Sequence, residues 1–79
     1  MSHHELDARF LMCPLPVIRT QDKVAHLQTG DTLEINCTDP GALYDIPAWC
    51  RIHGHTVLAA IKGAREIRVT VSVGVKAAS

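Results

Sequence analysis

One short stretch decides how this chain folds, Met12-Cys13-Pro14-Leu15-Pro16-Val17. A proline has its φ angle fixed near the helical value and no N–H group to donate, so the first turn of a helix accommodates it well. No further proline or glycine follows until Gly30. The two prolines, Pro14 and Pro16, therefore predict the start of a helix that runs from about Pro14 to Leu27.

This helix start puts Cys13 at the N-cap or just before it. The positive end of the helix dipole favours an anion at that place. A thiolate is the nucleophilic form of cysteine, and helix N-termini are among the places where the pKa of a cysteine falls. Cys13 is therefore the candidate reactive thiol, and the alternative for it is a buried structural cysteine.

Alternation of apolar and polar residues predicts four strands. In chain order they are Glu5–Leu11, Thr32–Cys37, His55–Lys62 and Glu66–Val73. The first would place Leu6, Ala8 and Phe10 on one face. The second would bury Leu33, Ile35 and Cys37, and the fourth would bury its isoleucine and valines.

A second helix is predicted after Cys37. Asp39 can cap a helix whose first residue is Pro40. Pro47 conflicts with a straight helix, so we expect either a kink there or a start near Asp45. Gly54 would end the helix.

The order strand, helix, strand, helix, strand, strand predicts an α/β fold. It is a two-layer βαβαββ sandwich, with a four-stranded mixed sheet and two helices packed on one face. The last two strands would form a hairpin, and a helical crossover would join the first two. Residues 1–79 are expected to form a single domain.

Composition narrows the function classes. Lys plus Arg and Asp plus Glu number eight each, so direct binding to nucleic acid or to an anionic membrane is not expected. One Phe, one Tyr and one Trp offer little for stacking on RNA bases. No apolar run approaches the roughly 18 to 20 residues of a membrane span, and the first residues do not resemble a secretory signal. Three cysteines argue against a disulfide scaffold and for the reducing cytoplasm.

The other two cysteines, Cys37 and Cys50, are expected in the apolar core. A metal site from Cys50, His53 and His55 is an alternative, but its spacing is not a standard zinc pattern. We therefore expect neither a metal nor a cofactor. A redox role, with Cys50 resolving a disulfide at Cys13, is a further alternative that lacks the usual Cys-x-x-Cys spacing.

Four blocks of the sequence together resemble the TusA/SirA-like sulfur carrier family. The first is Leu6-Asp7, a short gap and then Cys13-Pro14-Leu15-Pro16, which has the form Cys-Pro-x-Pro. The others are Gly30-Asp31-Thr32-Leu33, Thr38-Asp39-Pro40-Gly41, and Asp45-Ile46-Pro47-Ala48-Trp49-Cys50 followed by Gly54-His55. The resemblance covers the chain from about Leu6 to Val73.

The resemblance implies a cytoplasmic, monomeric sulfur carrier that holds sulfur as a persulfide on Cys13. The donor would be a cysteine desulfurase or a rhodanese-like sulfurtransferase, and the acceptor a DsrE-like or other protein. The pathways served by the family are tRNA 2-thiolation, sulfur oxidation and molybdenum cofactor synthesis. A small regulatory or RNA-binding domain is the alternative from another class.

The chain departs from the family around the cysteine, because members often have Gly where Phe10 stands and some have a basic residue where Met12 stands. A thiolate at Cys13 would then depend on the helix terminus, on the N–H groups of Leu15 and Val17, and on Arg9 folding back. The residues around Cys13 also form the expected partner-docking surface. It comprises Arg9, Phe10, Met12, Leu15 and Pro16, with Arg19 at its rim.

Overall fold

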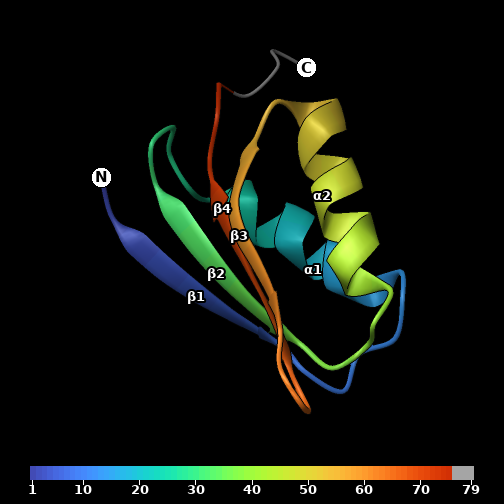
Figure 1. Ribbon diagram of the computed structural model, residues 1–79. Helices are drawn as coiled ribbons and strands as arrows, with labels where there is room; N and C mark the ends of the chain where they lie inside the picture. The colour runs from blue at the N-terminus through green and yellow to red at the C-terminus, as the bar shows by residue number, and fades with distance from the viewer. Residues whose placement is uncertain (76–79) are drawn as a thin grey trace.

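The computed structural model describes residues 1–75, which form one four-stranded sheet covered by two helices (Figure 1). The elements are β1 (His3–Ala8), α1 (Leu15–Val24), β2 (Thr32–Cys37), α2 (Ala42–His53), β3 (Thr56–Lys62) and β4 (Ile67–Ser72). The strand order is β1-β2-β4-β3, with β1 parallel to β2 and the other two pairs antiparallel. Both helices lie on the same side of the sheet, as Figure 1 shows. The predicted βαβαββ sandwich, its hairpin and its crossover are confirmed.

The core lies between the helices and the two central strands, β2 and β4. Leu33, Ile35, Val69 and Val71 are fully buried on the inner face of these strands. The helices add the side chains Val24, Ile46 and Cys50. Cys37 and Cys50 are 0% exposed, and burial raises the pKa of each thiol to about 11. Their predicted role as small core residues is confirmed.

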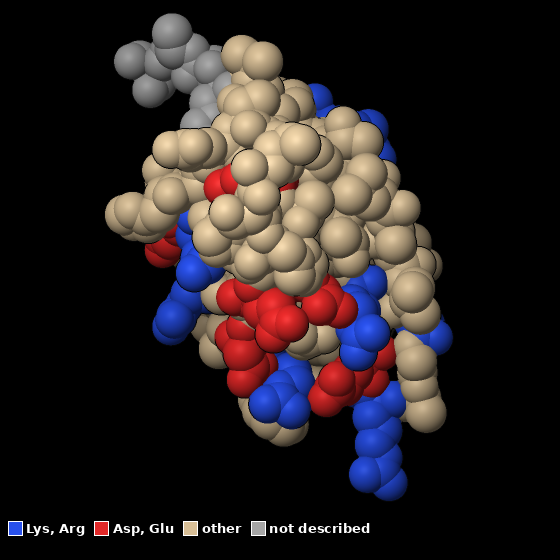
Figure 2. Space-filling model, turned by 90° about the vertical axis from the view of Figure 1, so that its left-hand side faces the viewer, with Lys and Arg blue, Asp and Glu red and all other residues tan. Residues whose placement is uncertain are grey.

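The opposite face of the sheet carries mixed charges. Figure 2 looks at the molecule from the left-hand side of Figure 1 and shows Lys and Arg beside Asp and Glu over its lower part. Glu34 of β2 pairs there with Arg68 of β4 at 2.7 Å. Such exposed pairs contribute little to stability, and they leave this face with no dominant charge.

The first strand begins two residues earlier and ends three residues earlier than predicted, and the interpretation of Phe10 was wrong. β1 ends at Ala8, the last residue paired with β2, and a turn follows. In that turn the carboxylate of Asp7 accepts the N–H of Arg9 at 3.1 Å, and Thr38 Oγ1 accepts the N–H of Phe10 at 2.8 Å. Phe10 has φ 65° and its side chain is 83% exposed, so it faces solvent rather than the core.

The helix boundaries also differ in detail from the prediction. α1 begins at Leu15 with Pro14 at the N-cap, and after Val24 the chain continues to Leu27 in tight turns. α2 begins at Ala42, between the two predicted starts at Pro40 and Asp45. Pro47 lies inside α2. Because it has no N–H, the helix lacks one backbone hydrogen bond at this position. Gly54 ends α2 with φ 80°, as predicted.

No helix within residues 1–75 combines the length and the apolar content that crossing a lipid bilayer would take. Residues 76–79, which the sequence predicts to be a short tail after the last strand, lie outside the described residues.

Gly74 is the position where the fold leaves no space for a side chain. A Cβ atom on Gly74 would lie 1.9 Å from the carbonyl oxygen of Gly54. We therefore expect Gly74→Ala to lower the free energy of unfolding by about 2–4 kcal/mol, because the backbone of one segment must move. Urea denaturation measures this, with Ser72→Ala as the control that should change stability by less than about 0.5 kcal/mol. Equal stability of the two variants would contradict the close approach.

Candidate functional site

The candidate site lies where two loops leave the same edge of the sheet. Cys13 is in the loop between β1 and α1, while Asp39 precedes α2 and Asp45 lies in its first turn. Because β1 and β2 are parallel, with Ala8 opposite Cys37 as their last pair, both loops begin side by side. The carboxyl ends of parallel strands are the usual place for a functional site in α/β folds.

Asp39 holds the backbone of both loops. One of its oxygens, Oδ2, accepts the N–H of Cys13 at 2.7 Å, and the other, Oδ1, accepts the N–H of Gly41 at 3.0 Å. These two hydrogen bonds, that from Cys13 first, lower the pKa of the Asp39 carboxyl. Asp39 is therefore ionised at neutral pH and fixes the position of Cys13.

The sulfur of Cys13 lies against the start of α2. The thiol donates a hydrogen bond to Oδ2 of Asp45. Gly41, the N-cap of α2, is next to this contact, since a Cβ atom there would lie 3.4 Å from the sulfur. A half-buried thiol, a carboxylate and a bare backbone segment thus form the centre of the site.

These surroundings raise the pKa of Cys13 to about 11. The hydrogen bond to Asp45 is the largest cause, followed by burial and by the negative charges of Asp45 and Asp39. The general expectation that the helix start lowers this pKa was wrong. The structure does place Cys13 just before the N-cap Pro14, as predicted, but the two carboxylates outweigh the helix terminus.

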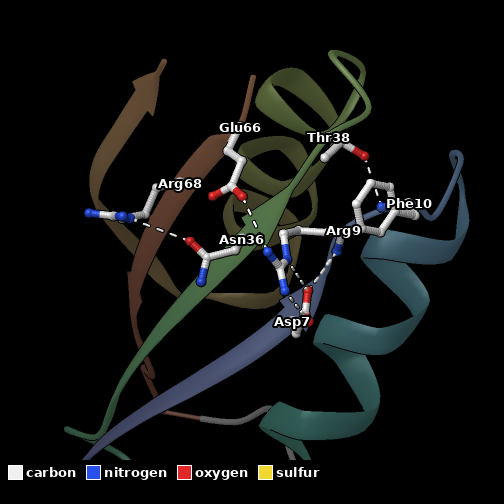
Figure 3. Close-up of polar contacts among 7 residues, drawn as sticks. All are labelled: Asp7, Arg9, Phe10, Asn36, Thr38, Glu66 and Arg68. Atoms are coloured by element: carbon white, nitrogen blue, oxygen red, sulfur yellow. Dashed lines mark hydrogen bonds and ion pairs between the residues drawn. The ribbon is translucent and has the colours of Figure 1, made fainter. Parts of the chain in front are cut away.

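Two groups expected to stabilise a thiolate, the guanidinium of Arg9 and the N–H of Leu15, are used elsewhere. Arg9 binds Asp7 in two places, at 2.9 and 3.1 Å, and reaches Glu66 at 3.4 Å (Figure 3). The hydrogen bond from Arg9 lowers the pKa of Asp7 to about 2. The N–H of Leu15 donates to the carbonyl of Met12 at 2.9 Å. Arg9 therefore does not fold back onto Cys13.

The expected docking residues divide into two groups. Phe10, Met12 and Leu15 are 83%, 76% and 42% exposed and lie within three residues of Cys13. Pro16 is fully buried, so its place on the docking surface was wrong. Arg19 is exposed and lines a shallow groove beside β1 together with Leu6, Asp22, Lys23 and His26.

The structure does not assemble the alternative metal site. Cys50 is fully buried, whereas His53 and His55 lie against the ring of Trp49 with centroids 5.1 and 5.0 Å away. Within residues 1–75, the ligand atoms that come together in a possible metal-binding group belong instead to His3, Glu5 and Glu34. Glu34 of that group is already paired with Arg68.

Asp39 and Asp45 are the site residues that sequence reasoning missed, because it assigned both to helix capping. The available signal was topological. A helical crossover between the first two strands makes them parallel, so the loops that follow them must meet at one edge of the sheet.

Comparison with known proteins supports one family. The family model described as "Sulfurtransferase TusA" matches residues 4–73. "Putative sulfur carrier protein YrkI" of Bacillus subtilis is 43% identical over 53 residues, which cover 67% of this chain and 71% of that protein. "Putative sulfur carrier protein NMA0882" of Neisseria meningitidis is 43% identical over 60 residues, covering 76% and 81%. The crystal structure of a SirA-like protein from Desulfitobacterium hafniense shares the fold, with a TM-score of 0.79 at 23% identity over 91% of this chain and 99% of that one.

The protonated state of Cys13 can be tested by alkylation of the native protein. With a pKa of about 11, we expect iodoacetamide to modify Cys13 at pH 8 about a hundred times more slowly than an unstructured cysteine peptide. The rate should still rise about tenfold per pH unit up to pH 10. Cys37 and Cys50, which are fully buried, should remain unmodified until the protein unfolds. A rate that levels off below pH 9 would contradict the hydrogen bond to Asp45.

Proposed function

This chain belongs to the TusA sulfurtransferase family, and we propose that it carries sulfur as a persulfide on Cys13. Its named relatives from Bacillus subtilis and Neisseria meningitidis support a carrier role. In this proposal a donor protein loads Cys13 and an acceptor protein unloads it. The donor is a cysteine desulfurase or a rhodanese-like protein, and the acceptor is a DsrE-like protein or another sulfur acceptor.

The observation that carries the proposal is the exposure of one thiol alone. Of the three cysteines, Cys13 is half-buried and reachable from solvent, whereas Cys37 and Cys50 are fully buried. A sulfur relay needs one thiol that two partners can reach in turn. The redox alternative needs a second thiol that can reach Cys13, and the complete burial of Cys50 weighs against it.

Each transfer is an exchange between sulfur atoms. The sulfur of Cys13 attacks the outer sulfur of the donor persulfide, a new S–S bond forms, and the donor leaves as a thiol. A thiol of the acceptor then attacks the outer sulfur on Cys13, and Cys13 returns to a thiol. This is the chemistry of thiol–disulfide exchange, and the chain supplies for it a nucleophile held at a fixed backbone position.

The exposed apolar residues beside Cys13 suit partner docking. Phe10, Met12 and Leu15 are exposed side chains that a partner would cover when it brings its own cysteine to the site. Phe10 is held outward by the Thr38 hydrogen bond, and the guanidinium of Arg9 lies 5.9 Å from its ring. The partners are cytoplasmic proteins of tRNA 2-thiolation, sulfur oxidation or cofactor synthesis.

Intact-mass spectrometry tests the carrier role directly. After incubation with a cysteine desulfurase and cysteine, or with a rhodanese and thiosulfate, the protein should gain one sulfur that a reductant removes. Cys13→Ser should abolish this gain, and Cys50→Ser should retain it because Cys50 is buried in the core. Absence of added sulfur with both donors would refute the carrier proposal.

Docking can be tested with a matched pair of exposed apolar residues. Met12→Ala should lower kcat/KM for loading by the donor protein about tenfold, mainly through KM, because it removes contact area next to Cys13. Ile52→Ala is the control, since Ile52 is also exposed (78%) but lies near the far end of α2. The same loss in both variants, or in neither, would exclude Met12 from the docking surface.

A further inference from the structure

The contact between Cys13 and Asp45 poses a chemical requirement. The sulfur donates a hydrogen bond to Asp45, so it carries its proton in the resting protein. A thiol must lose that proton to attack another sulfur, since the thiolate is the nucleophile. Some group has to receive the proton as the new S–S bond forms.

We propose that Asp45 takes the proton of Cys13 as the sulfur is loaded and gives a proton back to Cys13 as the sulfur is handed on. This inference rests on the proposed carrier function. It makes Asp45 a catalytic residue, since its carboxylate touches the reacting sulfur.

The position of Asp45 suits a proton acceptor. Its oxygen Oδ2 is the hydrogen-bond acceptor of the thiol, and its backbone N–H is fixed to the carbonyl of Gly41 at 2.9 Å. The backbone of Gly41 borders this contact, since a Cβ atom there would lie 3.4 Å from the sulfur and 3.6 Å from Oδ2. General bases act at such hydrogen-bond distance from the proton that they remove.

The other titratable groups considered for Cys13 are poor proton acceptors. Asp39 holds two backbone N–H groups, and its lowered pKa makes its carboxylate a weaker base. Cys37 is fully buried with a raised pKa. Arg9 is bound to Asp7 and Glu66 and has no basic form to offer.

The histidines of the chain lie elsewhere. His3 and His4 are at the start of β1, the end opposite to the loop that holds Cys13. His26 lines the groove beside β1, and His53 and His55 lie against Trp49 at the far end of α2. Among the described residues, Asp45 is thus the base in contact with the sulfur.

The loading step balances with Asp45 as the base. The sulfur of Cys13 forms a bond to the outer sulfur of the donor R–S–SH, while its proton moves to the Asp45 carboxylate. The bond between the two donor sulfurs breaks, and R–S⁻ departs with the electron pair. Asp45 then releases the proton to that thiolate. The sum is Cys13–SH plus R–SSH giving Cys13–SSH plus R–SH.

The unloading step is the reverse for Asp45. The acceptor enters as a thiol and gives its proton to the Asp45 carboxylate while its sulfur attacks the outer sulfur on Cys13. The S–S bond to Cys13 breaks, the electron pair stays on the Cys13 sulfur, and that sulfur takes the proton from Asp45. The sum is Cys13–SSH plus R′–SH giving Cys13–SH plus R′–SSH. Neither step consumes an oxidant or a reductant.

The Asp45 carboxylate could act in two ways, by disfavouring the thiolate or by accepting its proton. Replacing Asp45 by Asn changes the loading rate in opposite directions in these two cases. The substitution removes the charge that disfavours the thiolate, so the thiolate fraction at neutral pH should rise. If transfer used only this preformed thiolate, Asp45→Asn would load sulfur faster. If Asp45 is the base, Asp45→Asn must load it more slowly.

The experiment compares two rates on the same proteins at pH 7.5, alkylation by iodoacetamide and loading by glutathione persulfide. The small donor removes any effect on docking. In Asp45→Asn we expect alkylation about tenfold faster and loading about a hundredfold slower. Asp45→Glu should recover part of the loading. Asp22→Asn, an exposed aspartate of α1 in the groove beside β1, should leave both rates unchanged.

The remaining outcomes overturn the inference in distinguishable ways. Faster loading in Asp45→Asn would show that the carboxylate only suppresses the thiolate. Unchanged loading would show that Asp45 is not the base. Slow loading with unchanged alkylation would show that Asp45 does not hold the thiol proton, so that the slow loading has another cause. Failure of the unsubstituted protein to take sulfur on Cys13 would refute the carrier function itself, even if the alkylation rates still differed.

Discussion

The site depends on the parallel pairing of β1 with β2. This pairing ends at Ala8 and Cys37, so the loop that carries Cys13 and the loop that carries Asp39 start from neighbouring positions. Asp39 then joins the two loops through the N–H groups of Cys13 and Gly41. Without the parallel pair, residues that are 32 positions apart, such as Cys13 and Asp45, would have no reason to meet. The hairpin of β3 and β4 completes the core but adds no group to this contact.

Two electrostatic effects oppose each other at Cys13, and their distances decide the result. The end of a helix is worth about 0.3–1 kcal/mol to a nearby charge and acts within the first turn. A carboxylate in direct hydrogen-bond contact acts at much shorter range, and Asp39 adds a second negative charge. The balance therefore favours the protonated thiol, although Cys13 stands at a helix start. A Cys-Pro-x-Pro sequence alone does not determine the charge state of its sulfur.

The sequence was sufficient to predict the fold wherever the local pattern and the burial agree. In Thr32–Cys37 and in the last strand, the apolar residues of the alternating pattern are the buried ones. Gly54 ends α2 with a positive φ angle, which glycine adopts readily. Phe10 could not be placed in this way, since its outward position follows from hydrogen bonds to Asp7 and Thr38 around it. The contacts of Arg9 could not be predicted for a similar reason, because they combine Asp7, two residues away, with Glu66, which is 57 residues away.

The hydrogen bond between Cys13 and Asp45 also bears on how long the carrier survives. Peroxides oxidise cysteine through its thiolate, first to a sulfenic acid and then to irreversible sulfinic and sulfonic acids. In the proposed carrier, a thiol that keeps its proton until a persulfide arrives is a poor target for this chemistry, although it is only half-buried. The carboxylate that delays ionisation would thus shield the sulfur from oxidative damage between the proposed transfers.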